Sequence, residues 1–141
     1  MAKRKIIIGN WKMNPPTLKE AQNLFANVIK KTSLVKKTEI VVCPPFVYLE
    51  KLKKMTKKIS LGAQNAFWKD VGAYTGEVSS AMLEDIGVKY VILGHSERRA
   101  MGETSIDINK KVKASIPLGL LPILCVGENT READHSYFNI V

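Results

Sequence analysis

Cysteine is scarce in this chain of 141 residues: Cys43 and Cys125 lie far apart in apolar stretches, and no CxxC spacing occurs. The disulfide framework of a small secreted domain and the paired-cysteine motif of a structural zinc site therefore find no support. We expect both cysteines to be small buried residues in a reducing compartment, with a disulfide or a shared metal ion as the alternative.

Long apolar runs are lacking as well. The longest, residues 118–126, is broken by Gly119 and Pro122, and none approaches the about 18–20 residues that span a bilayer. The basic start, residues 1–5, is followed by too short an apolar core for a signal peptide and by no cleavage site. The sequence thus predicts a soluble, cytoplasmic chain with no membrane partner. Its 45% of apolar residues suffice for the core of a single domain over residues 1–141.

Acidic residues are few, and the formal net charge is +9. Such a surplus raises nucleic-acid binding as a hypothesis. The lysines, however, occur as pairs spread along the chain, which is typical of solvated surfaces, and no helix-turn-helix, RNP or zinc-finger pattern focuses them. We therefore predict no nucleic-acid partner, and a basic protein can equally attract an anionic small substrate. The pairs are Lys30-Lys31, Lys36-Lys37, Lys53-Lys54, Lys57-Lys58 and Lys110-Lys111.

One unit recurs along the chain: a short apolar run that ends in a polar residue, followed by a stretch with helical spacing. Apolar runs without alternation are typical of strands covered on both faces, as in parallel sheets. The alternation predicts an α/β fold, either an open doubly wound sheet or a closed (β/α) barrel. The runs lie at residues 6–8, 40–43, 59–63, 90–93 and 120–126.

The segments between the runs carry helix signals. Thr17 to Glu20 has the spacing of a capping box, and apolar residues three and four apart follow as far as Ile29. Further helices are predicted over 46–52, over 79–86 with Gly87 as the stop, and over 104–116 with Thr104 as the cap and Pro117 as the breaker.

Three polar strings follow predicted strands, at the place where barrel enzymes keep their sites. They are Gly9-Asn10-Trp11-Lys12-Met13-Asn14, Gly94-His95-Ser96-Glu97-Arg98-Arg99 and Ala73-Tyr74-Thr75-Gly76-Glu77. Together with residues 63–65 and 125–128, these strings closely resemble the triosephosphate isomerase family. The resemblance runs collinearly from about Lys5 to about Glu128.

The resemblance implies the TIM (β/α)8 barrel fold, here as an incomplete barrel of about five parallel strands with alternating helices. It implies an isomerase of glycolysis and gluconeogenesis that interconverts dihydroxyacetone phosphate and D-glyceraldehyde 3-phosphate through an enediolate, with no cofactor and no metal. That reaction needs a base for the carbon-bound proton, an electrophile for the carbonyl oxygens and a cation for the phosphate.

By the same resemblance, His95 is the electrophile, Lys12 binds the phosphate and oxyanion, and Asn10 gives an amide hydrogen bond to the substrate. Glu97 is the carboxylate that partners Lys12, although a first-turn glutamate favoured by the helix dipole is the alternative. Because Ser96 is a good N-cap, we expect His95 to precede a helix N-terminus whose dipole disfavours the imidazolium form.

Thr75 and its loop resemble the segment that this family inserts into a partner subunit, beside the partner's catalytic residues. The resemblance therefore implies a homodimer with a two-fold interface, and a mobile surface loop is the alternative. Arg98, Arg99 and Glu103 are expected to form a structural charge cluster, and His135 to be merely exposed.

A complete (β/α)8 chain needs about 250 residues and eight strands. In the family, the catalytic glutamate follows the sixth strand, and glycine-rich phosphate loops follow the seventh and eighth; none of these segments is found here. Glu128 matches a structural glutamate of the family, so we do not assign it as the base. We expect the 141 residues alone to be inactive and, with two open sheet edges, prone to aggregation. A non-catalytic half-barrel or interaction module is the alternative.

Overall fold

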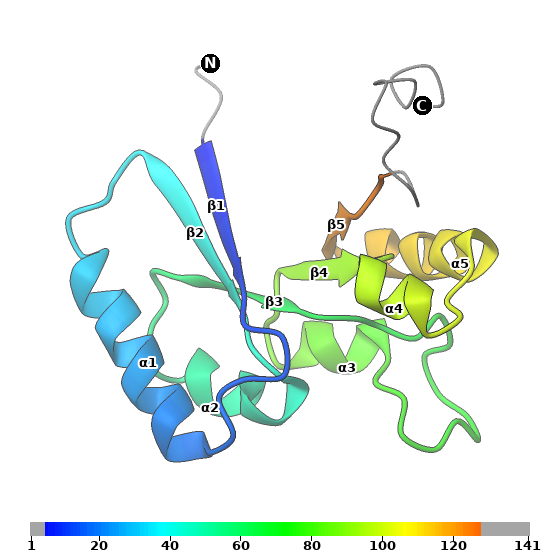
Figure 1. The fold of residues 1–141 in the computed structure, drawn as a ribbon, viewed down its shortest axis with the longest axis horizontal. Helices are drawn as coiled ribbons and strands as arrows, with labels where there is room; N and C mark the ends of the chain where they lie inside the picture. The colour runs from blue at the N-terminus through cyan, green and yellow to red at the C-terminus, as the bar shows by residue number, and fades with distance from the viewer. Residues whose placement is uncertain (1–4, 128–141) are drawn as a thin grey trace, which may run out of the picture.

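The computed structural model describes residues 5–127, so Glu128, His135 and the rest of the segment 128–141 lie outside the described residues. Five parallel strands form one sheet whose order is that of the chain, β1-β2-β3-β4-β5 (Figure 1). The elements are β1 (Lys5–Asn10), α1 (Leu18–Lys31), β2 (Thr38–Cys43), η1 (Phe46–Tyr48), α2 (Leu49–Lys53), β3 (Ser60–Ala63), α3 (Ser80–Asp85), β4 (Tyr90–Leu93), α4 (Ser96–Ala100), α5 (Ser105–Ser115), η2 (Ile116–Leu118) and β5 (Leu121–Leu124).

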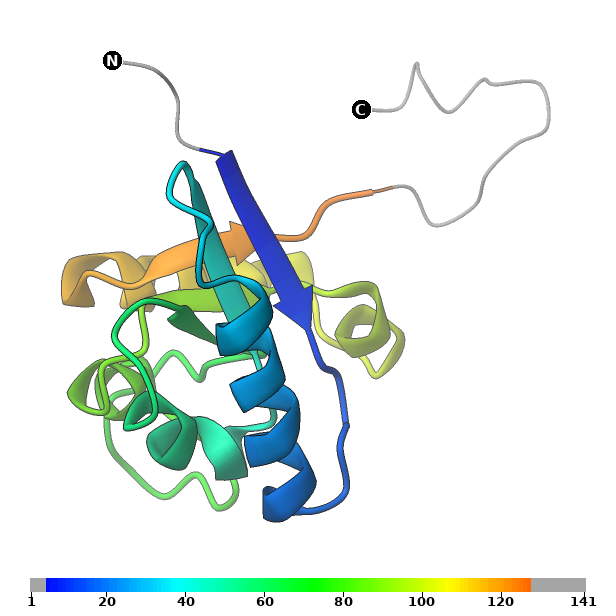
Figure 2. The ribbon, with the colours of Figure 1, turned by 90° about the vertical axis from the view of Figure 1, so that its left-hand side faces the viewer.

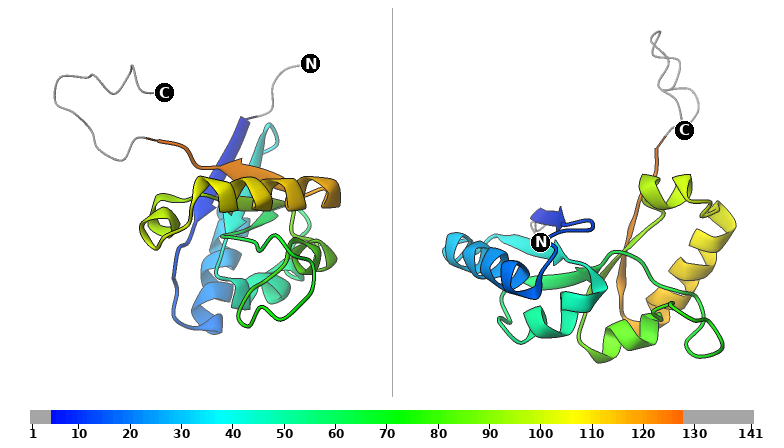
Figure 3. Two further views of the ribbon diagram at one scale, coloured as in Figure 1. Left: turned by 90° about the vertical axis from the view of Figure 1, so that its right-hand side faces the viewer. Right: turned by 60° about the horizontal axis from the view of Figure 1, so that its bottom comes forward.

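The sheet is curled rather than flat. Figure 3 shows it curving with α1, α2, α3 and α5 on its convex side and no helix inside the curve. A doubly wound sheet reverses its strand order and carries helices on both faces, whereas a barrel adds each strand beside the previous one. The barrel alternative is therefore confirmed, in the form of an incomplete (β/α)8 barrel of five strands.

The two faces of the sheet belong to two apolar clusters. Val42, Leu61 and Val91 point outward and pack with the buried faces of the helices in the main core. Val41 and Tyr90 belong to a second cluster on the inner face, which the pairing of Val41 with Ser60 and of Gly62 with Tyr90 keeps in register. This coverage of both faces explains why the apolar runs of β2, β3 and β4 do not alternate with polar residues.

The helices begin at the predicted caps. The Thr17 hydroxyl accepts the Glu20 backbone N–H at 3.3 Å, which is one of the two bonds of the predicted capping box. In place of the second bond, from the Thr17 backbone N–H to the Glu20 carboxylate, the Thr17 hydroxyl donates to that carboxylate at 3.0 Å. Thr104 forms a complete box with Asp107. Gly87 ends the third predicted helix with φ +77°, a conformation that favours glycine.

The two outer strands leave apolar side chains in solvent. Ile6, Ile7 and Ile8 of β1 are exposed, as are Leu121 and Leu124 of β5. Within residues 5–127, each of these strands has one strand neighbour. In the same part of the chain, no helix has both the length and the apolar character required to cross a bilayer.

Candidate active site

The loop after β1 is fixed tightly to its neighbours. The Lys12 backbone N–H donates to Oδ1 of Asn10 at 2.9 Å, and the Trp11 N–H donates to the Cys43 carbonyl at 3.0 Å. Nε2 of Gln64 donates to the carbonyls of both Lys12 and Cys43, each at 2.8 Å. These bonds hold Lys12 at φ +53°, a left-handed conformation that few residues other than glycine adopt.

The far side of this loop is held as well. The Tyr48 hydroxyl donates to the Pro15 carbonyl at 2.9 Å, and the Trp11 ring stands edge-on to Phe25 of α1 with 6.3 Å between ring centroids. Contacts from β2, η1, α1 and Gln64 thus hold the loop that carries Lys12. Because the loop is already held, only the side-chain torsions of Lys12 remain to be ordered when its ammonium group binds a partner.

His95 follows β4 and caps the short helix α4. Nδ1 of its ring accepts the Glu97 backbone N–H at 3.3 Å. A nitrogen that accepts a hydrogen bond carries no proton, so this geometry assigns the ring proton to Nε2, which is left as a donor. The prediction that Ser96 is the N-cap is wrong, because His95 occupies the cap position and Ser96 is the first helical residue.

Lys12 and Glu97 join the two strand ends by an ion pair. Nζ of Lys12 lies 2.6 Å from Oε1 of Glu97, and Oε2 of Glu97 lies 3.5 Å from Nδ1 of His95. The hydrogen bond from Lys12 holds the pKa of the Glu97 carboxyl below its ordinary value. The pair is half exposed, so solvent screens it and its contribution to stability is small.

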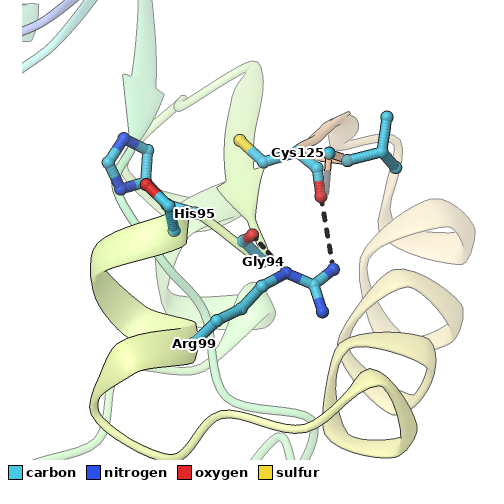
Figure 4. Close-up of a pocket in the computed structure, with 7 residues that line it drawn as sticks. Gly94, His95, Arg99 and Cys125 are labelled. Atoms are coloured by element: carbon cyan, nitrogen blue, oxygen red, sulfur yellow. Dashed lines mark hydrogen bonds between the residues drawn. The ribbon is translucent and has the colours of Figure 1, made fainter. Parts of the chain in front are cut away.

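These side chains line one cleft of about 200 Å³ at the carboxyl ends of β1 and β4, together with Gln64 and Met13. A second hollow, of about 380 Å³, lies on the other side of His95, against residues 125–127, which follow β5. Figure 4 shows its wall, where Arg99 donates to the carbonyls of Gly94 at 2.8 Å and Cys125 at 3.3 Å. The arrangement offers a cation, an amide and an imidazole N–H to a small anionic molecule.

Comparison with known proteins decides the family. The model of the family described as triosephosphate isomerase matches residues 5–141. The chain belongs to the triosephosphate isomerase family. The resemblance found in the polar strings is thereby confirmed.

The chain is 50% identical over 135 residues to the triosephosphate isomerase of Alkaliphilus oremlandii, and the matched stretch covers 94% of this chain and 54% of that protein. It is 51% identical over 130 residues to the triosephosphate isomerase of Thermoanaerobacter sp. (strain X514), and here the matched stretch covers 90% of this chain and 52% of that protein. The chain spans about half the length of the curated relatives it matches.

In this chain, all four residues predicted for the cleft, Asn10, Lys12, His95 and Glu97, lie together. Thr75 lies in the exposed loop between β3 and α3, and it is not among the residues that line the cleft. Sequence reasoning missed the positioning roles of Gln64 and Tyr48. Gln64 stands directly after a predicted strand, which is the one signal that could have pointed to it.

The expected charge cluster exists with a different membership. Arg98 donates to the Glu103 carboxylate at 3.0 Å, and the buried Lys111 pairs with the same carboxylate and donates to Oδ1 of Asn65 at 2.8 Å. The hydrogen bonds that the Arg99 guanidinium group makes within residues 5–127 go instead to Gly94, Ser105 and Cys125. Burial raises the pKa of Glu103, but the bonds from Lys111 and Arg98 outweigh it and hold the pKa below its ordinary value.

Proposed function

We propose that this chain contributes the electrophilic and phosphate-binding side of a triosephosphate isomerase active site. The reaction would interconvert dihydroxyacetone phosphate and D-glyceraldehyde 3-phosphate by moving one proton between neighbouring carbons through an enediolate. The observation that carries the proposal is the convergence of Asn10, Lys12 and His95 on one small cleft at the strand ends.

Each of the three residues can offer one group to the substrate: those of Asn10 and His95 have no partner in their contacts within residues 5–127, whereas that of Lys12 is paired with Glu97. Oδ1 of Asn10 is occupied by the Lys12 N–H, which leaves the amide NH₂ as the donor. Nδ1 of His95 is occupied by the Glu97 N–H, which leaves Nε2–H to polarise the substrate carbonyl. Nζ of Lys12 reaches Glu97 and brings the positive charge that a phosphate and a developing oxyanion require.

The general base is proposed to come from outside residues 5–127. Among the described residues lining the cleft, Glu97 is the one carboxylate, and its ion pair with Lys12 and lowered pKa make it a weak base. The hollow between His95 and β5 has no carboxylate in its described lining and offers space for one. Since a general base contributes about 10²–10⁴ to rate, residues 1–141 alone are expected to turn over at least that much more slowly than a complete enzyme.

The proposal extends to the setting of the enzyme. A homodimer would place the loop around Thr75 against a partner subunit, as the family resemblance implies. The exposed position of that loop is compatible with such a contact. The pathway would be glycolysis and gluconeogenesis in the cytoplasm, with no cofactor.

Binding of phosphoglycolate tests the site independently of turnover, because this small molecule carries a phosphate and a carboxylate that imitates the enediolate charge. Calorimetry should show binding that falls about ten- to hundred-fold in Lys12→Met, which removes a charged hydrogen-bond donor. Lys19→Met, which changes an exposed lysine on α1, serves as the matched control. Unchanged affinity in Lys12→Met would contradict the proposal, and no binding by the wild-type protein would favour a non-catalytic half-barrel.

A further inference from the structure

The fold gathers lysine pairs that the sequence leaves apart. Loop 32–37 leads from α1 into β2, and loop 54–59 leads from α2 into β3. Because β2 and β3 are parallel neighbours, both loops lie at the end of the sheet where the strands begin (Figure 2). The cleft lies at the other end, where β1 and β4 finish. Nζ of Lys58 donates to the carbonyls of Thr32 and Ser33 and so ties the loops together. We call the following exposed lysines the basic surface: Lys30, Lys31, Lys36, Lys37, Lys57 and Lys58.

The charge of the basic surface is not neutralised locally. Residues 30–37 and 54–59 include no aspartate and no glutamate. The glutamates nearest in sequence already have lysine partners outside the six, since Glu39 pairs with Lys89 and Glu50 pairs with Lys54. Two further acidic residues, Glu84 and Asp85, lie at the end of α3 and so belong to neither of the two loops. Four of the six like charges lie on the two adjoining loops and two lie at the end of α1; they repel one another, and a polyanion relieves that repulsion.

An apolar tip stands within this surface. Leu34 is 88% exposed, and Val35 beside it is partly exposed. The turn that carries them is well defined: the Ser33 N–H donates to the Lys30 carbonyl at 3.3 Å, and the Val35 N–H donates to the Thr32 carbonyl at 3.0 Å. A fixed turn therefore presents a leucine to solvent between two lysine pairs.

The combination of exposed lysines and an exposed leucine favours an anionic bilayer over a nucleic acid. A nucleic-acid backbone offers charge but nothing apolar for an isolated leucine, and no exposed aromatic platform for stacking bases is found among residues 30–37 and 54–59. A bilayer of anionic phospholipids offers both headgroup charge for the lysines and an acyl boundary beneath it for the leucine.

Although the sequence alone predicts no membrane partner, we propose that the basic surface binds reversibly to membranes that contain anionic phospholipids, with Leu34 inserted among the headgroups. The lysine stems lie along the interface while their ammonium groups pair with headgroup phosphates. Because the surface lies at the opposite end of the strands from the cleft, the bound protein keeps Asn10, Lys12 and His95 open to small molecules in the aqueous phase.

Co-sedimentation with phospholipid vesicles tests the proposal. Wild-type protein should sediment with vesicles containing phosphatidylglycerol at about 0.05 M salt, and it should be released at about 0.5 M salt, where screening is short-ranged. Vesicles of phosphatidylcholine alone should retain none. Lys36→Gln/Lys37→Gln should weaken binding about 25-fold, which is about five-fold for each lysine. Leu34→Ser should weaken it about ten-fold through lost apolar burial.

Lys19→Gln/Lys69→Gln is the matched control, because it removes the same charge from exposed lysines that belong to neither loop. Its binding should equal that of the wild type, and circular dichroism should show the same fold in every variant. Failure of the wild type to sediment at low salt overturns the proposal. Equal loss of binding in the control variant overturns it too, since net charge alone would then explain the effect. Tighter binding of duplex DNA that is indifferent to Leu34→Ser overturns it in favour of a nucleic-acid partner.

Discussion

Replacing Lys111 by methionine should destabilise the protein strongly although the residue is remote from the cleft. Lys111 is 3% exposed on α5, and its ammonium group contacts the Glu103 carboxylate and Oδ1 of Asn65. Methionine retains the apolar stem and most of the volume. The change therefore removes a charge and its hydrogen bonds while it leaves the packing largely intact.

The magnitude follows from what Glu103 would lose. Its side chain is 5% exposed, and its Oε2 atom has no hydrogen-bond partner among the described residues. Without Lys111, the carboxylate keeps only the bond from Arg98, which is itself partly exposed. Breaking one partner from a buried pair costs about 3–5 kcal/mol. Because Arg98 remains, we expect a loss near the lower end, about 3 kcal/mol.

Urea unfolding of the purified protein at neutral pH, followed by circular dichroism, measures this loss. Lys110→Met is the matched control, since Lys110 is an exposed neighbour that pairs with Asp107, and its loss should cost less than about 1 kcal/mol. The double variant Glu103→Gln/Lys111→Met leaves no buried charge and should regain most of the lost stability. The reasoning is refuted if Lys111→Met is as stable as Lys110→Met, or if the double variant is no more stable than the single one.

The same cluster predicts a dependence on acid. The folded pKa of Glu103 lies below its ordinary value, so its stabilising contribution is fully present above the unfolded pKa of about 4.3. As the pH falls through the folded pKa, that contribution is lost. The wild type should therefore lose more of its free energy of unfolding than the double variant when both are titrated from neutral pH into this acidic range.

Two further outcomes concern the site and the thiols. In a longer chain that also supplies the general base, His95→Gln should lower turnover about 100-fold or more while it changes phosphoglycolate affinity far less, and equal losses in both measurements would mean that the role is misassigned. Iodoacetamide should modify Cys125 well before Cys43, because Cys43 is fully buried and burial raises its pKa to about 12; mass spectrometry that finds equal rates would count against the packing of β2.

Much of the architecture could be predicted because the local signals and the tertiary environment agree. A strand lies at each apolar run, the strands β3 and β4 are largely buried, and Thr104 caps its helix as its side chain favours. The strand after η2 is shorter than the predicted run 120–126, since pairing with β4 extends only over Leu121–Leu124. Local sequence signals do not distinguish an open sheet from a barrel. The order of the strands in the sheet does.

The remaining errors arise where a residue's partner is distant in sequence. By propensity Ser96 is the better cap, but the turn after β4 places the His95 ring over the first helical N–H groups. Lys111 belongs to a lysine pair that looks solvated, although it shares a helix face with the buried Ile108 and Ser115 at spacings of three and four residues. The sequence shows that spacing, but it does not show that Glu103 is the acidic partner of Lys111.

Because the strand order equals the chain order, every strand pairs with the one synthesised just before it. Such a sheet can grow by one unit at a time as the polypeptide leaves the ribosome, without waiting for distant segments. The cleft is different, since Lys12 meets Glu97 across 85 positions of the chain. Assembly of the scaffold is thus gradual during translation, whereas the contact between Lys12 and Glu97 forms only once the fourth strand and the helix after it are in place.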